Sequence, residues 1–393
     1  MQTLTSILHP YSIDQFLSEN WTKRGVFIPT EAPDRFRHLF SWQQLNNILN
    51  FHKPRNPELR FALNGEILSS SEPQEWIKHC KQGASLVLSR VNERVSALAE
   101  LIWALQQEIG HNKAHFNTYC SWPSLQGFNC HYDTHEVFIL QIEGQKEWFV
   151  FEDTLKYPYR EDEFQYQKQP EAEPYIQCIL NPGDVLYIPR GHWHYAIAQD
   201  KPSLHLTLGI HCLKGRDWLE WLVEEIRAKE VWRKNLPLMP DGDTVDIEEY
   251  VNNLCGHLTA TLTQHKEELA QKYAQAQTLE NTRLPRMQEI SLPSQVGFGI
   301  FEQGLETRLR PPKFQKVRVE PLAEGGYQLI TANKKVNFKG LEPKIVENLV
   351  KHVFSGETFT VGDVAKWLPE CNLETTILPL LSGLIKEGMI VVD

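Results

Sequence analysis

The sequence has no long hydrophobic segment, and this excludes one large class of proteins. No apolar run approaches the roughly eighteen residues that a membrane-spanning helix needs. The first residues, Met1 to Thr5, lack the basic and apolar regions of a secretory signal. We therefore expect a protein that is not secreted and does not bind a membrane.

Paired cysteines and an excess of positive charge are also missing. The seven cysteines are scattered over 393 residues, odd in number and without a Cys-x-x-Cys pair. This pattern disfavours both a disulfide framework and a thiolate metal site, and it predicts reduced thiols in a cytoplasmic protein. The net charge of −10 disfavours nucleic acid as a direct ligand and is compatible with a basic protein partner.

The chain is long enough for two or three domains, and its middle reads as short strands. Val137–Gln141 and Lys146–Phe151 are apolar runs around Glu143-Gly144-Gln145, which predicts a hairpin. The turn-forming residues 181–184 precede another short run, Val185–Ile188. Short strands joined by glycine and proline turns favour a β-sandwich or jelly roll.

The run Ser203–His211 alternates between apolar and other residues. Its even positions are leucine or isoleucine, so they share one face of the strand. His205, Thr207, Gly209 and His211 share the other face. A polar inner face is unusual for a plain core and natural for a barrel that holds a solvated site.

The strongest chemical motif is His131-Tyr132-Asp133, with the turn Pro189-Arg190-Gly191 and the histidines His192 and His194 about sixty residues later. Alternate residues of a strand point the same way, so His131 and Asp133 can converge on one ion. Two imidazoles and one carboxylate form the facial triad that binds Fe(II) and leaves its other face open. His135 shares the parity of these residues, and spacing alone does not decide among the histidines.

Helical patterns flank the predicted strands. Ser12 opens a short helix that runs to about Asn20, and Arg94–Ile109 has helical apolar spacing that ends at Gly110. Residues 218–277 are again helical in pattern. The sequence thus predicts an α+β protein with three parts: 1–213 with the strands, 214–305 helical, and a C-terminal domain over 306–393.

The C-terminal part predicts a winged helix. Three short helices, Pro343–Val353, Val361–Trp367 and Thr375–Lys386, follow strand-like runs at 316–319 and 328–330, and a last strand closes a wing. Pro379 suits the third helix only in its first turn.

From Gly340 onward the chain has four basic and eight acidic residues, a net charge of −4. A DNA-binding helix needs cations for the phosphates, so this module predicts protein contact rather than DNA binding.

Two long motifs give the chain a family resemblance. Residues 131–148, His-Tyr-Asp-Thr-His-Glu-Val-Phe-Ile-Leu-Gln-Ile-Glu-Gly-Gln-Lys-Glu-Trp, and residues 182–194, Pro-Gly-Asp-Val-Leu-Tyr-Ile-Pro-Arg-Gly-His-Trp-His, resemble the core of the JmjC-type ribosomal oxygenases. These are Fe(II)- and 2-oxoglutarate-dependent protein hydroxylases of the cupin superfamily. The resemblance covers roughly residues 5 to 215 and implies a double-stranded β-helix core.

The resemblance also implies roles for particular residues. It selects His194 as the third ligand beside His131 and Asp133, and gives His135 and His192 no ligand role. Lys146 would hold the distal carboxylate of 2-oxoglutarate, for which an ammonium is a suitable partner.

Further features of the family extend to the cosubstrate pocket and the assembly. Thr207 and Tyr119 would add hydroxyl hydrogen bonds to the same carboxylate, and Asn117 is a weaker candidate for the pocket wall. The helical middle part resembles the dimerisation region of the family, and its large apolar residues predict a homodimer.

The resemblance implies that the substrate is an arginine or histidine side chain of a ribosomal protein. Another peptide, such as a natural-product precursor, would need the same catalytic residues. The motifs are also compatible with an N-methyl-lysine demethylase and with a non-enzymatic, metal-binding cupin that acts as an interaction module. The acidic residues 161–163, 171 and 173 lie in a predicted loop. This loop is either simply solvated, or it forms a rim of the pocket that attracts a basic substrate.

Overall fold

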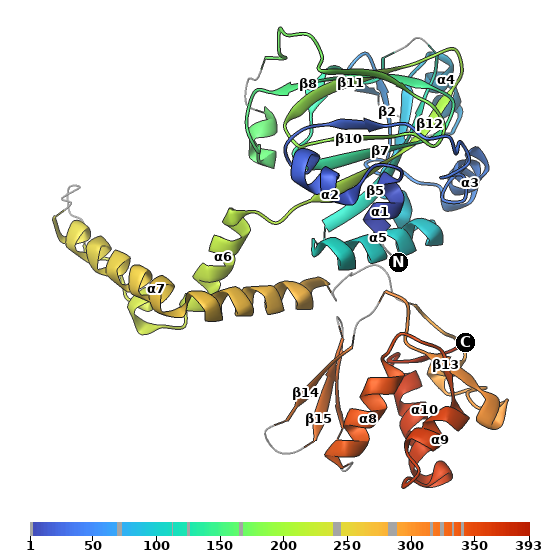
Figure 1. The fold of residues 1–393 in the computed structure, drawn as a ribbon, viewed down its shortest axis with the longest axis vertical. Coiled ribbons are helices and arrows are strands. Elements are labelled where there is room, and N and C mark those ends of the chain that lie inside the picture. Colours follow the sequence, from blue (N-terminus) through green and yellow to red (C-terminus); the bar gives the residue numbers. More distant parts are fainter. Residues whose placement is uncertain are drawn as a thin grey trace. The chain divides into compact units, whose positions relative to one another are not determined.

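Figure 1 shows a computed structural model of the chain. It describes residues 3–68, 73–111, 113–123, 126–164, 168–238, 245–281, 289–314, 317–322, 326–331, 334–338 and 342–393. The chain divides into two compact units, Met1–Asn235 and Leu236–Asp393. This division does not test the three predicted parts, which stay a prediction.

The first unit contains a mixed-length antiparallel sheet of eight strands in the order β1-β10-β7-β12-β5-β4-β2-β3. The predicted strands at 185–188 and 203–211 are confirmed within it. Its strands are β1 (Val26–Ile28), β2 (Leu59–Leu63), β3 (Glu66–Leu68), β4 (Ser85–Leu88), β5 (Lys113–Ser121), β7 (Glu136–Glu143), β10 (Val185–Ile188) and β12 (Ser203–His211).

A second sheet of four strands, in the order β6-β11-β8-β9, belongs to the same unit. Its strands are β6 (His131–Tyr132), β8 (Lys146–Asp153), β9 (Ile176–Leu180) and β11 (His192–Ala198). Strands β7 and β8 belong to different sheets, so the predicted hairpin is instead a crossing between the two sheets at Gly144. Gly144 has φ +70, and a Cβ there would lie 2.1 Å from the carbonyl oxygen of Pro202, so only glycine fits this turn.

Two hydrophobic layers explain why the eight-stranded sheet is stable. The even-numbered side chains of β12 are fully buried in one cluster with residues of helices α1 (Thr3–Leu8) and α5 (Ser96–Ile109). Val137 and Ile139 of β7 pack instead with Trp148 and Val150 of β8, between the two sheets. The predicted alternation of β12 is therefore confirmed.

Apart from the short helix η4, which lies between β8 and β9, the remaining helices of the first unit lie before β5 or after β12. Ser12 caps α2 by accepting a hydrogen bond from the Gln15 amide, and α5 ends at Gly110 with φ +70, as predicted. These elements are α2 (Ile13–Gln15), η1 (Phe16–Asn20), α3 (Trp42–Asn47), η2 (Ile48–His52), α4 (Pro73–Lys81), η3 (Val91–Glu93), η4 (Arg160–Phe164), α6 (Gly215–Ile226) and η5 (Glu230–Arg233). The 157–175 segment, predicted as a loop, contains the short helix η4.

The second unit begins with the long helix α7 (Val245–Asn281), whose backbone departs from helical geometry at His265. The three predicted C-terminal helices are confirmed, and Pro379 lies in the first turn of the last one. The elements are η7 (Ser294–Val296), η8 (Gly304–Glu306), β13 (Arg308–Arg310), β14 (Arg318–Pro321), β15 (Tyr327–Ile330), β16 (Lys335–Phe338), α8 (Pro343–Val353), β17 (Phe359–Thr360), α9 (Val361–Trp367), η9 (Leu373–Ile377), α10 (Leu378–Lys386) and β18 (Val391–Val392).

These strands form two three-stranded sheets, β17-β13-β18 and β14-β15-β16. Residue 316 of the predicted strand 316–319 lies outside the described residues. Over the described part of the chain, every helix is too short or too polar to cross a bilayer.

Candidate active site

The polar inner face of β12 lines a cavity of about 80 Å³ between the two sheets of the first unit. One buried water needs only about 10–15 Å³ on the same measure, so a small ligand fits this space. Both sheets contribute to the wall. The lining residues are Ser85, Tyr119, Gly127, Phe128, His131, Asp133, Val137, Ile139, Lys146, Trp148, His194, Tyr195, Ala196, His205 and Thr207.

Strand pairing brings the three predicted metal ligands together at this cavity. In the antiparallel pair β6–β11, His131 lies directly opposite His194. Their ring centroids are 4.6 Å apart, and Asp133 Oδ2 lies 3.6 Å from His194 Nε2. One ligand atom from each of the three residues lies within 4.8 Å of the others, so the group could hold one ion.

Backbone hydrogen bonds orient both imidazoles toward the cavity. His131 Nδ1 lies 2.8 Å from the carbonyl oxygen of Asn129, and His194 Nδ1 lies 3.1 Å from that of His192. When Nδ1 donates to a carbonyl, Nε2 keeps its lone pair for an ion. The side chains present therefore fit a metal with mixed nitrogen and oxygen ligands.

The electrostatics of the group favour the forms that bind metals. Burial, together with the neighbouring His131, lowers the pKa of His194 to about 4. Burial by itself would raise the pKa of Asp133, but the histidines around it, His135 first, outweigh burial and lower that pKa. At neutral pH His194 is therefore neutral and Asp133 is ionised, as metal ligation requires.

Lys146 places an amine in the wall of the same cavity. It is 7% exposed, and burial lowers its pKa to about 8. Its Nζ donates to Ser121 Oγ at 2.9 Å, and Ser121 Oγ lies 3.0 Å from Ser85 Oγ. Among the described residues no carboxylate lies within ion-pair distance of Lys146. A buried ammonium with no counter-ion is costly, and an anionic ligand would relieve that cost.

The remaining predicted pocket residues divide into two groups. Thr207 and Tyr119 line the cavity, as expected. Asn117 is not among the lining residues; its side chain accepts a hydrogen bond from the Arg90 amide and contacts the Tyr119 hydroxyl. It therefore supports a wall residue instead of forming the wall.

His205 and Trp148 are among the wall residues to which the sequence assigned no site role. His205 stacks on Tyr119 with ring centroids 5.1 Å apart and planes 2° from parallel, and it is 2% exposed. It shares the face of β12 with Thr207, so strand parity could have identified it. Trp148 lines the cavity and also packs in the core between the two sheets.

The two histidines without a predicted ligand role lie outside the cavity. The His192 ring bonds through Nδ1 to the Tyr175 hydroxyl at 2.8 Å. His135 lies beside His115 and His211 and is not itself a lining residue, although it is close enough to Asp133 to lower the pKa of that carboxyl. Arg190 is also outside, with its guanidinium over the Tyr157 ring.

Comparisons with known proteins agree with this geometry. The JmjC domain family matches residues 93–217, which include all three candidate metal ligands. The bifunctional lysine-specific demethylase and histidyl-hydroxylase NO66 of Drosophila persimilis is 29% identical over 258 residues, 60% of this chain and 36% of that protein. Ribosomal oxygenase 1 of Danio rerio is 26% identical over 261 residues, 59% of this chain and 46% of that protein.

The fold extends the likeness to the whole chain. The Escherichia coli ribosomal oxygenase YcfD has a TM-score of 0.58 and 18% identity, and the match covers 98% of both chains. A YcfD structure in complex with cobalt and 2-oxoglutarate matches with a TM-score of 0.56 at 18% identity, covering 98% of this chain and 99% of that one. This chain spans less than half the length of the curated relatives it matches.

Residues 93–217 therefore form a JmjC domain inside an α+β fold. In sequence the chain is similar to NO66 and to ribosomal oxygenase 1, over about 60% of its own length.

The uncompensated charge of Lys146 gives a stability prediction. Its pKa falls from 10.5 in the unfolded chain to about 8 in the fold. At neutral pH the charged amine then costs up to about 3 kcal/mol, at 1.36 kcal/mol per pKa unit. Lys146→Met should raise the free energy of unfolding of the ligand-free protein by about 1–3 kcal/mol at pH 7.

The gain should shrink as pH rises from 8 to 10.5, because only the folded wild type loses its proton in this interval and so becomes more stable relative to the variant. Urea unfolding at pH 7 and pH 10 measures both values. The exposed Lys201→Met is the control and should change neither. A variant less stable than wild type at pH 7 would contradict the assignment.

Proposed function

We propose that the protein is a 2-oxoglutarate- and Fe(II)-dependent oxygenase that hydroxylates a side chain of another protein. One observation carries this proposal: a buried lysine amine, with no carboxylate partner among the described residues, faces the same cavity as a group of two histidines and one aspartate. An anion and a metal ion are the two ligands that these residues would bind together. The YcfD complex contains both kinds of ligand, cobalt and 2-oxoglutarate.

The chain's own residues would divide the work as follows. His131, Asp133 and His194 would hold Fe(II), and the lowered pKa values of His194 and Asp133 favour the neutral imidazole and the ionised carboxylate that ligation needs. When bound, iron would activate O₂, and the oxidative decarboxylation of 2-oxoglutarate would drive that activation. Lys146 pairs with the distal carboxylate of 2-oxoglutarate, and the hydroxyls of Thr207 and Tyr119 border the same space.

The rest of the wall excludes water from this chemistry. Val137, Ile139 and Trp148 are at most 6% exposed and form the apolar side of the cavity. Apolar surroundings strengthen the interaction between the ammonium of Lys146 and a carboxylate. A dry cavity also limits turnover without substrate.

The substrate that best fits is a basic segment of a ribosomal protein, hydroxylated at arginine or histidine. The names of the relatives support this, because they include ribosomal oxygenases and histidyl-hydroxylases. Their names also include lysine demethylase, so that activity is the second candidate. A different peptide substrate is a third possibility, and a non-enzymatic metal-binding module is the fourth.

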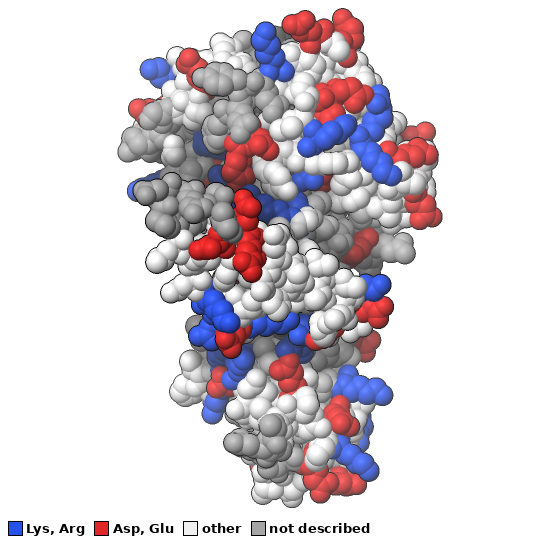
Figure 2. Space-filling model, turned by 90° about the vertical axis from the view of Figure 1, so that its left-hand side faces the viewer, with Lys and Arg blue, Asp and Glu red and all other residues white. Residues whose placement is uncertain are grey.

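Charge supports a basic protein partner and not DNA. On the face in Figure 2, acidic and basic side chains form small groups of each sign among uncharged residues. Glu161, Glu171 and Glu173 are exposed, as the predicted acidic rim requires, and Glu161 lies 3.4 Å from Arg216. The side chain of Glu163 lies outside the described residues. All seven cysteines are free, in support of a cytoplasmic location.

The finer architecture is part of the same proposal. We propose that the four-stranded sheet and the facing strands of the large sheet form a double-stranded β-helix. Helices α8, α9 and α10 with the short strands β13, β17 and β18 would form the winged-helix module. We retain the predicted boundaries of three parts, 1–213, 214–305 and 306–393.

Removal of one ligand should separate metal binding from folding. Asp133→Ala should abolish succinate formation from 2-oxoglutarate and leave the circular dichroism spectrum unchanged, because the residue borders a cavity. Lys146→Met should keep the metal but raise the KM for 2-oxoglutarate about ten- to a hundredfold, the loss of one buried, charge-assisted hydrogen bond. The exposed Asp200→Ala is the matched control. Full activity of Asp133→Ala would refute the metal site.

Mass spectrometry should identify the substrate class. We expect ribosomal proteins incubated with the enzyme, iron and 2-oxoglutarate to gain about 16 Da on an arginine or histidine, as insertion of one oxygen atom requires. The Asp133→Ala enzyme should give no such shift. A loss of about 14 Da from methylated lysine would establish the demethylase instead, and no change in any protein or peptide would favour the binding module.

The helical segments after β12 support a homodimer. Leu219 and Val223 on α6 are 51% and 54% exposed, and Val251 on α7 is 45% exposed. Exposed apolar residues of this kind mark interfaces, and two-fold pairing is the commonest closed arrangement. Light scattering at micromolar concentration should return about twice the 45.6 kDa of one chain. Leu219→Glu with Val223→Glu should shift this mass toward the monomer, whereas a monomeric wild type would contradict the proposal.

A further inference from the structure

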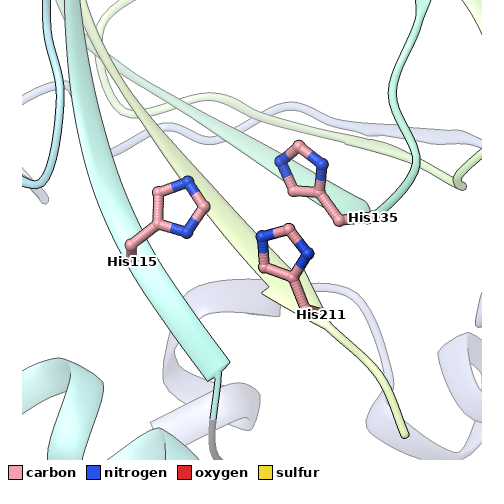
Figure 3. A group of neighbouring side chains, drawn as sticks. All are labelled: His115, His135 and His211. Atoms are coloured by element: carbon pink, nitrogen blue, oxygen red, sulfur yellow. The ribbon is translucent and has the colours of Figure 1, made fainter. Parts of the chain in front are cut away.

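Three histidines outside the candidate active site form a second cluster in the first unit. His115 lies on β5, His211 ends β12, and His135 immediately precedes β7. Strand β12 pairs with both β5 and β7, and this places the three residues at one end of the same sheet. Figure 3 shows the three rings converging from these separate segments. One ring nitrogen from each lies within 4.8 Å of the others.

Gly209 provides the space in which the rings meet. It is paired with His115 on one side and Val137 on the other. A Cβ at this position would lie 2.6 Å from His135 Cδ2 and 2.8 Å from His115 Cε1. Any other residue in the middle strand would therefore push two of the three rings away. The cluster therefore requires glycine at position 209.

The ring nitrogens of the cluster are available for a ligand. The His135 and His211 rings are 4.6 Å apart and 12° from parallel, and His115 lies 5.4 Å from His211. Within the described residues no hydrogen bond is made by any of the three imidazoles. The triad histidines differ, because each has its Nδ1 at a carbonyl oxygen. All three cluster residues are partly buried, so solvent can reach them.

The cluster is distinct from the cavity of the candidate active site but lies near it. None of its three residues lines that cavity. Thr207 lines it, and Gly209 and His211 follow on the same face of β12 at two-residue steps. Each such step advances about 7 Å along a strand. A ligand at the cluster would thus be a neighbour of the cavity on the inner face of the sheet.

We propose that His115, His135 and His211 form a second metal site that binds a divalent transition metal such as Zn²⁺. Three imidazoles without a carboxylate suit zinc, copper or nickel and not magnesium or calcium. Three protein ligands leave one tetrahedral position open to water or to a donor group on an incoming molecule.

The required adjustment of the rings is small. Tetrahedral ligation at the usual zinc–nitrogen distance of about 2.1 Å puts the nitrogens about 3.4 Å apart. The present separation of at most 4.8 Å means that each ring moves by about 1 Å. No hydrogen bond to a described residue opposes that movement. This proposal does not depend on the proposed oxygenase activity.

Metal counting on the full-length chain tests the second site. The protein is stripped with a chelator, dialysed against micromolar Zn²⁺, and its zinc measured per chain. Wild type should bind two ions, Asp133→Ala one, and Asp133→Ala with His211→Ala none. The exposed His52→Ala is the matched control and should keep two. If wild type binds one ion and His211→Ala binds none, then the His131, Asp133 and His194 group does not bind zinc and the second site does.

Cobalt gives a second, geometric readout. Asp133→Ala loaded with Co²⁺ should show the intense visible absorption of a tetrahedral ion, and His211→Ala or His115→Asn should remove it. Gly209→Ala should weaken Co²⁺ binding at least tenfold without removing a ligand. Circular dichroism identifies any variant that fails to fold. The folded variants then show whether the three histidines bind the metal. The proposal is wrong if Asp133→Ala binds no zinc or cobalt, or if folded cluster variants bind both as well as Asp133→Ala does.

Discussion

The pairing of β6 with β11 is the constraint on which the candidate active site depends. Strand β6 has only two residues, yet its register sets His131 opposite His194. Asp133 follows two positions after His131, on the same face of the chain. A slip of one residue in this pairing would turn the imidazoles to opposite faces. The surrounding sheets hold a very short strand in the one register that assembles the group.

Much of this arrangement could be predicted from local sequence patterns. The alternation of Ser203–His211 predicted its buried face correctly, and the spacing of His131 and Asp133 predicted two members of the group. Turns and caps such as Ser12 and Gly110 were also readable, because their conformations depend on a few adjacent residues. The position of Lys146 in the cavity followed from a family resemblance, since periodicity could not distinguish it from a surface lysine.

What the sequence did not reveal depends on distant pairing. Strands β1 to β4 were not predicted: they are three to five residues long and are stabilised by neighbours far along the chain. The crossing at Gly144 reads locally as a hairpin, but the two flanking strands pair with different partners. The cluster of His115, His135 and His211 is invisible for the same reason, because only the order of β5, β12 and β7 brings its members together.

The hydrogen bond from Lys146 to Ser121 joins the two sheets across the cavity. The lysine belongs to β8 of the smaller sheet, whereas Ser121 and Ser85 belong to neighbouring strands of the larger one. Ser121, itself hydrogen-bonded to Ser85, holds the ammonium through a neutral oxygen, which binds it less strongly than a carboxylate would. The gap between the sheets is thus bridged by a contact that an anion can reinforce. Filling the cavity would change how rigidly the two sheets are held together, and not only the occupancy of one pocket.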